Sequence, residues 1–421
     1  MTPACRLDIH SGRPDPVSPD TARELIIKAP KGTPPSPLPL AVLTPALLTT
    51  SLTAVSCDAR TGHDSTDTLE RWTLSAEPTV VIGGADEREG YLLHGVVGAT
   101  RLADGRIVVA NEGTLQLRYY DPEGEHLYDA GGPGEGPGEL ESLSGIVRLP
   151  GDSVLVDSWL GLTRFGPDGR HASSIPYDLP PYYGECRWSV EGGQHPLADG
   201  SIVAVALVYV GIFGGRRCPQ PSESQPPAVI GRFIPTTGVF DTIAEVPGTE
   251  ESYPDDAYAY PKTVVFAVGD DRIYLGQTGS DTILAMSVTG DTVATLLAPF
   301  EPVPVPADAR VSGSARLNWT YPDHYPRYAR LAAAPRERVW VMAYPTLKEP
   351  VAYPELMSPT TFRRLEDGGA RWRVVDRDGL SIAEVRMPEG FFLLEVGDDH
   401  VLGLHKDELE RESVQVYQLI R

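Results

Sequence analysis

An internal repeat constrains the fold of this chain more than any other feature of its sequence. Residues 98–125 and 145–170 follow one scheme, in which two apolar strands joined by a tight turn precede a short loop, an alternating strand and a turn containing Pro and Gly. The first turn of each copy holds an Asp-Gly or Gly-Asp dipeptide, which favours a tight β-hairpin. Four further copies place their first turns near Asp199, Asp270, Arg336 and Asp398.

Six such units predict a closed ring of small sheets. The spacings between successive first turns are 47, 48, 71, 66 and 62 residues, whereas a solenoid keeps a tighter period and a propeller tolerates insertions in its loops. The last unit ends after its third strand, and an additional strand over about 72–82 precedes the first unit. We therefore predict an all-β, six-bladed β-propeller with four-stranded antiparallel blades, whose ring is closed when the 72–82 strand pairs into the last blade.

The first 57 residues are typical of an export signal. Residues 1–57 form a Pro-rich leader in which two lysines precede an apolar, uncharged run over 38–55. The small residues that follow resemble a bacterial lipobox, which implies lipidation of Cys57. A short transmembrane anchor or a buried helix is the alternative for the apolar run. Residues 58–69 are predicted to be a polar tether and 70–421 the propeller domain, held at the cell envelope by lipid on the periplasmic or outer side.

Composition narrows the possible partners. The chain has 36 Lys and Arg against 58 Asp and Glu, for a formal net charge of −22. Nucleic-acid binding requires an excess of basic residues for phosphate contact, so this class of function is disfavoured. The 42 Gly and 40 Pro have no short period, which indicates many turns between short strands.

The second unit resembles a known repeat. Residues 131–168 contain a Gly-rich loop, a strand, a tight turn, a Val-x-Asp strand end and a closing Pro-Asp-Gly turn, which is similar to the NHL repeat. The stretch over 70–421 resembles the six-bladed NHL-like propeller lipoproteins of environmental bacteria. This resemblance implies the same fold and a lipid anchor, and most of those lipoproteins have no assigned function.

Long connections are predicted to gather on one face of the ring, here called the long-loop face. They cover residues 177–191, 208–230, 248–261, 298–327 and 344–370. Long loops on a rigid scaffold commonly carry binding surfaces. The candidate contact residues are Tyr182, Tyr183, Trp188, Tyr258, Trp319, Tyr321, His324, Tyr325 and Tyr344. The alternative is that these aromatic side chains pack the long loops against each other.

Acidic residues lie among these aromatic side chains, so the face favours a cationic or sugar-like partner over an anionic one. We expect a protein, peptide or saccharide ligand, no nucleic acid, and contact with the membrane only through the lipid anchor. Cys186 and Cys218 both fall on this face, and export implies an oxidising compartment, so a disulfide between them is predicted. Two free buried thiols are the alternative.

A search for catalytic motifs favours a protein without an enzymatic activity or a cofactor. No Cys-x-x-Cys, His-Glu-x-x-His or Gly-x-Ser-x-Gly motif occurs. Ca²⁺-dependent lactonases share the six-bladed fold and place Asn, Asp and Glu around the central channel. Asn111, Asp157 and Asn318 are the candidate Ca²⁺ ligands by this comparison, although Asn111 and Asp157 could instead cap loops through hydrogen bonds. The leading hypothesis is a non-catalytic binding module, and the alternative is a Ca²⁺-dependent lactonase-like hydrolase.

Overall fold

The computed structural model describes the chain from residue 69 to residue 421 with internal gaps. The gaps are at 159–160, 177–186, 198, 210–226, 235, 238, 251–255, 270–271, 311–317, 348–357, 361 and 363–368. The predicted leader, Cys57, nearly all of the predicted tether and the predicted Cys186–Cys218 disulfide lie outside the described residues. In the described part of the chain, no helix is long and apolar enough to cross a membrane.

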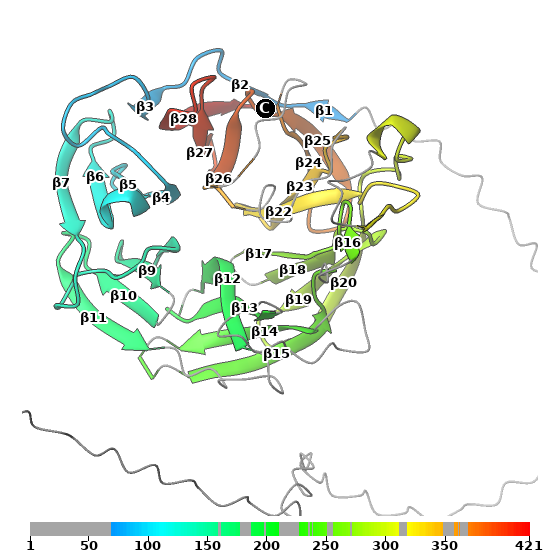
Figure 1. Ribbon diagram of the computed structural model, residues 1–421, viewed down its shortest axis with the longest axis horizontal. Coiled ribbons are helices and arrows are strands. Elements are labelled where there is room, and N and C mark those ends of the chain that lie inside the picture. Colours follow the sequence, from blue (N-terminus) through cyan, green and yellow to red (C-terminus); the bar gives the residue numbers. More distant parts are fainter. Residues whose placement is uncertain are drawn as a thin grey trace, which may run out of the picture. The chain divides into compact units, whose positions relative to one another are not determined.

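Six antiparallel sheets form the ring (Figure 1). Blade one consists of β4 (Val96–Arg101), β5 (Ile107–Asn111), β6 (Gln116–Tyr120) and β7 (His126–Gly131). Blade two consists of β8 (Gly145–Arg148), β9 (Val154–Ser158), β10 (Gly161–Phe165) and β11 (His171–Pro176). Blade three consists of β12 (Arg187–Pro196), β13 (Ile202–Tyr209), β14 (Pro227–Ile234) and β15 (Val239–Pro247).

The second half of the ring repeats this order. Blade four consists of β17 (Val264–Val268), β18 (Arg272–Gln277), β19 (Thr282–Ser287) and β20 (Thr292–Leu297). Blade five consists of β22 (Tyr328–Ala334), β23 (Arg338–Ala343), β24 (Arg371–Val375) and β25 (Ser381–Arg386). Blade six consists of β26 (Phe391–Val396), β27 (His400–Lys406), β28 (Glu412–Ile420) and the N-terminal β3 (Val80–Gly83). The innermost strands β4, β8, β12, β17, β22 and β26 each contact the next around a closed circle.

Pairing of the two ends of the described chain closes the ring, as predicted. The outer strand of blade six is β3, which runs antiparallel to β28 from Val80 opposite Val416 to Gly83 opposite Ser413. The predicted continuous strand over 72–82 is, however, divided into two. Pro78 lies in the interval between β2 (Thr73–Leu74) and β3, and because proline cannot donate to a β-ladder, it interrupts a regular strand.

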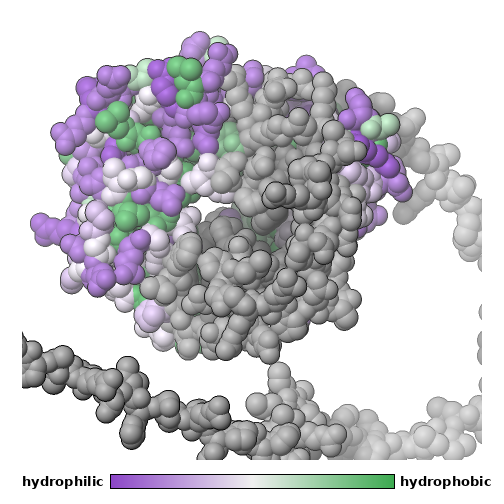
Figure 2. All heavy atoms as spheres, viewed as in Figure 1, coloured by the Kyte–Doolittle hydropathy of each residue, from purple (hydrophilic) through white to green (hydrophobic). Residues whose placement is uncertain are grey.

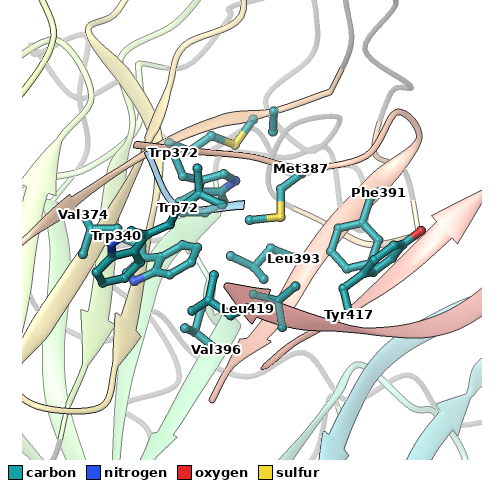
Figure 3. Packing of buried hydrophobic residues seen from close by; sticks show 14 of the residues in the cluster. Trp72, Trp340, Trp372, Val374, Met387, Phe391, Leu393, Val396, Tyr417 and Leu419 are labelled. Carbon is teal, nitrogen blue, oxygen red and sulfur yellow. The ribbon is translucent and has the colours of Figure 1, made fainter. Parts of the chain in front are cut away.

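The N-terminal segment also joins two blades. The short β1 (Glu70–Arg71) pairs in parallel with β25 of blade five, and β2 pairs with the end of β28 of blade six. Trp72 lies between these two short strands and is only 4% exposed, with its ring 6.3 Å from that of Trp340. Figure 3 shows Trp72 beside Trp340 and Trp372, within the apolar cluster between blades five and six. The segment is therefore fixed by side-chain burial as well as by strand pairing.

Turn chemistry explains why each blade folds locally. In blade one, Gly105 has a φ of +91° in the turn between β4 and β5, a conformation that side chains other than glycine rarely adopt. The backbone N–H of Leu102 donates to the Arg106 carbonyl and that of Gly105 donates to the Leu102 carbonyl, which closes the hairpin. The Asp-Gly dipeptide at this position is thus required by the backbone geometry.

Candidate functional site

Three long connections pack together on the long-loop face. They join β15 to β17, β20 to β22, and β23 to β24. The first two pair in parallel as β16 (Asp256–Tyr258) and β21 (Asn318–Thr320), with Ala257 opposite Trp319. The second connection also folds back on itself, because the Val305 N–H donates to the Asp323 carbonyl and the Tyr325 N–H donates to the Val303 carbonyl.

A cluster of four tyrosines, Tyr260, Tyr321, Tyr325 and Tyr344, joins all three connections. The ring centroids of Tyr260 and Tyr325 are 4.7 Å apart in an edge-to-face arrangement, and those of Tyr325 and Tyr344 are 6.2 Å apart. Tyr321 contacts the edge of Tyr260 at 6.3 Å. Edge-to-face and offset packing are the favoured geometries for aromatic pairs, at about 0.5–1.5 kcal/mol each beyond area burial. We refer to these four residues as the tyrosine cluster.

Two hydroxyl groups of the tyrosine cluster, those of Tyr260 and Tyr325, meet at one carbonyl group. The Tyr325 hydroxyl donates to the Leu347 carbonyl at 2.6 Å, and the Tyr260 hydroxyl lies 3.2 Å from both the Leu347 and the Ala309 carbonyls. Burial raises the pKa values of Tyr325 and Tyr344, so these phenols stay protonated at neutral pH. The cluster is therefore a neutral structural joint between three loops.

The predicted contact residues divide into buried and accessible groups. Tyr325 is buried, Tyr258, Tyr321 and Tyr344 are half-buried, and His324 is exposed. Trp188 lies in β12 opposite Val208, and Trp319 lies in β21. Tyr182 and Tyr183 lie outside the described residues. The aromatic side chains of Tyr325 and Tyr344 thus pack the loops together, whereas Tyr258 and Tyr321 are partly accessible and His324 is exposed.

Tyr260 is a member of the cluster that the nine predicted contact residues omit. It is only 1% exposed and has a φ of +55°, which is unusual for a bulky residue. A left-handed backbone at tyrosine leaves no mark in the sequence. The only indication of Tyr260 in the sequence is that it lies two residues after Tyr258, in a connection rich in aromatic residues.

The three candidate Ca²⁺ ligands come from blade one, blade two and the connection between blades four and five. Asn111, at the end of β5, accepts from the His94 N–H at 2.7 Å and donates to the Thr114 hydroxyl at 2.8 Å. Asp157 is buried near the end of β9, and Asn318 belongs to β21 in the connection between blades four and five. Among the described residues, no group of three or more His, Cys, Asp or Glu side chains is placed to hold a metal ion. Asn111 thus caps a loop through hydrogen bonds, as in the alternative interpretation, and the Ca²⁺ assignment stays a prediction.

Comparison with known proteins yields structural similarities alone. No family model matches the chain, and no curated protein matches it. A member of the DUF4221 family from Bacteroides vulgatus has 13% identity and a TM-score of 0.47, with 83% of this chain and 99% of that chain covered. A predicted exported protein from Bacteroides fragilis has 12% identity and a TM-score of 0.44, with coverages of 85% and 96%.

A calcium-binding protein, regucalcin, from Agrobacterium tumefaciens has 12% identity and a TM-score of 0.41, with coverages of 83% and 96%. These similarities are too distant to assign an activity, and the fold rests on the strand topology described above. The chain is an all-β protein whose six antiparallel sheets form a six-bladed β-propeller.

Proposed function

We propose that this propeller is a non-catalytic binding module that captures a protein, peptide or saccharide through its long-loop face. The observation that carries the proposal is the joining of three long connections by the tyrosine cluster. A binding surface built from loops is effective when the loops are ordered before the ligand arrives, because less conformational entropy is then lost on binding. The ring provides the rigid base for these loops.

The accessible side chains support the same proposal. His324 and Asp323 are exposed near the end of the second connection, and the Asp323 side chain is 92% exposed, with one carboxylate oxygen 3.7 Å from the Arg310 guanidinium. Tyr321 and Tyr258, in or directly beside the paired part of the first two connections, are half-buried. Aromatic side chains with polar ends suit contacts with sugars and peptides. The carboxylate of Asp323 adds a preference for a cationic or hydroxyl-rich ligand.

Export and lipid anchoring belong to the same proposal and rest on the sequence of residues 1–57. A lipid on Cys57 and a polar tether would hold the propeller at the cell envelope, where extracellular peptides and saccharides are available. Metabolic labelling with an alkyne fatty acid tests this part. Labelling of the wild-type protein that is lost in Cys57→Ser is the expected result, and equal labelling of both would contradict it.

Binding is tested by probing the purified protein with a glycan microarray and an array of lysine-containing peptides. We expect retention on a subset of one array and a loss of at least about tenfold in the variant Tyr321→Ala/His324→Ala. Val293→Ser is the matched control, because Val293 is 53% exposed near the start of β20, the outer strand of blade four, and the second connection leaves from the other end of that strand. Binding that survives in the double variant, or that is lost equally in the control, would contradict the proposal.

A further inference from the structure

Each innermost strand carries at least one half-buried residue, and Figure 2 shows an opening near the middle of the ring. Among these residues are Val97, Ile146, His195, Phe266, Arg330 and Leu394. Burial lowers the pKa of His195 to about 4, so its imidazole is neutral at physiological pH. Among the described side chains, the half-buried charged residues of these strands are Arg101, Arg148, Arg330 and Glu395. Arg148 pairs with Asp152 and Glu395 lies 3.8 Å from His400.

The guanidinium of Arg330 is fixed between blades five and six. Its Nη2 donates to the Leu393 carbonyl of β26 at 3.0 Å. Its Cζ lies 3.8 Å from the ring centroid of Phe392 and 5.7 Å from that of Trp372. A guanidinium that stacks on an aromatic ring directs its N–H groups outward in its own plane. The stacking thus presents an ordered edge of hydrogen-bond donors.

The Phe392 ring is itself held by a second aromatic residue. Phe362, from the connection between β23 and β24, packs against Phe392 with centroids 5.1 Å apart. The Lys406 ammonium lies 4.8 Å from the centroid of the Phe362 ring. The Phe362–Phe392 pair therefore has one cation on each ring, Lys406 on Phe362 and Arg330 on Phe392. Through Phe392, Phe362 of the long connection supports the position of Arg330.

Arg330 has no acidic partner among the residues that the structure describes. Arg373 of the same blade, by contrast, pairs with Glu384 at 2.9 Å. The carboxylate of Glu412 lies 3.9 Å from the Lys406 ammonium and accepts from a backbone N–H. Burial without a compensating carboxylate lowers the pKa of Arg330 to about 9. Such a charge destabilises the protein unless an anion offsets it.

We propose that Arg330 anchors a binding site between blades five and six for a carboxylate attached to an apolar body. The only hydrogen bond of its side chain to a described residue is the one from Nη2 to Leu393, so Nε, Nη1 and the second N–H of Nη2 are left to donate. Nη2 forms a bidentate pair of donors with either Nη1 or Nε, and such a pair matches a carboxylate. The Phe392 ring under the guanidinium and the half-buried Leu394, which follows Leu393 on β26, favour an apolar or aromatic body on the same ligand. The site shares no residue with the tyrosine cluster and does not depend on the function proposed for it.

The first test uses the wild-type protein, with benzoate as the carboxylate probe. Phenylglyoxal modifies accessible arginines, and peptide mass spectrometry measures the rate at each one. We expect 20 mM sodium benzoate to slow the modification of Arg330 by about fivefold or more relative to sodium chloride of equal ionic strength. The rate at Arg327, whose side chain donates to the Phe300 carbonyl at 3.0 Å, should not change. No slowing at Arg330 would overturn the proposal.

The second test compares variants by thermal unfolding. Benzoate should raise the Tm of the wild type and of Arg327→Met by at least about 2 °C over the chloride control. It should raise the Tm of Arg330→Lys less and leave that of Arg330→Met unchanged. An equal rise in Arg330→Met would overturn the proposal. Sodium phosphate distinguishes the ligand class, since protection of Arg330 by phosphate equal to that by benzoate would overturn the assignment to a carboxylate on an apolar body.

Discussion

Replacement of Trp72 by alanine tests whether the N-terminal segment stabilises the ring. Trp72 is 4% exposed, packs against Trp340, and donates from its indole N–H to Glu70 at 2.9 Å. Truncation of a buried aromatic side chain to alanine costs about 3–5 kcal/mol. The two strands that flank Trp72 are only two residues long and can relax around the cavity. We therefore expect a loss near the lower end of this range, about 3 kcal/mol.

The measurement is equilibrium unfolding in urea, followed by circular dichroism of the β-sheet signal. For a propeller of this size we take a urea dependence of about 3 kcal/mol per M, so the midpoint should fall by about 1 M. Trp72→Phe should lose roughly half as much, because it keeps an aromatic ring in the same cluster.

Val81→Ala is the matched control for this prediction. Val81 lies in β3, the strand that closes the ring, but its side chain is 49% exposed. Its loss should change the free energy of unfolding by no more than about 0.5 kcal/mol. If Trp72→Ala shifts the midpoint no further than this control does, burial of the N-terminal segment does not stabilise the joint between blades five and six, and the reasoning is refuted.

Three further substitutions test other parts of the structure. Tyr325→Phe removes a hydroxyl that donates to the Leu347 carbonyl, so it should cost about 1–2 kcal/mol in urea unfolding and speed proteolysis of the long-loop face; an unchanged cleavage rate would contradict this role. Gly105→Ala forces a side chain into a turn with φ of +91° and should cost about 1–2 kcal/mol, whereas Gly145→Ala, at negative φ with open space around its Cα, should cost less. His400→Gln tests a pH effect. Glu395 at 3.8 Å and Asp399 at 3.0 Å raise the pKa of His400 in the folded state, so its protonated form stabilises the fold below about pH 6.5, and this contribution is lost as pH rises through the higher folded pKa. The substitution should therefore destabilise more at pH 5.5 than at pH 9, and an equal loss at both would exclude this linkage.

Local sequence patterns were sufficient to predict the blades. Alternation of apolar residues and Asp-Gly turns, such as the one at Gly105, act over a few residues, so each hairpin can be recognised within its own segment. The missing fourth strand of the last unit then required a strand from the other end of the chain, and β3 fills this place. The lipid anchor at Cys57 and the disulfide between Cys186 and Cys218 remain predictions from the sequence.

Tertiary structure decided the features that depend on residues far apart in the chain. Tyr260 and Tyr325 meet at the carbonyl of Leu347 because three connections of different blades come together there, and no spacing along the chain encodes that contact. The charge of Arg330 became significant only when the fold placed it beside Phe392, away from every described carboxylate. Short-range turn and strand preferences thus determined the number and form of the blades. Among the residues that the structure describes, long-range packing determined which side chains hold the loops together, which stay accessible, and that the charge of Arg330 has no ion-pair partner.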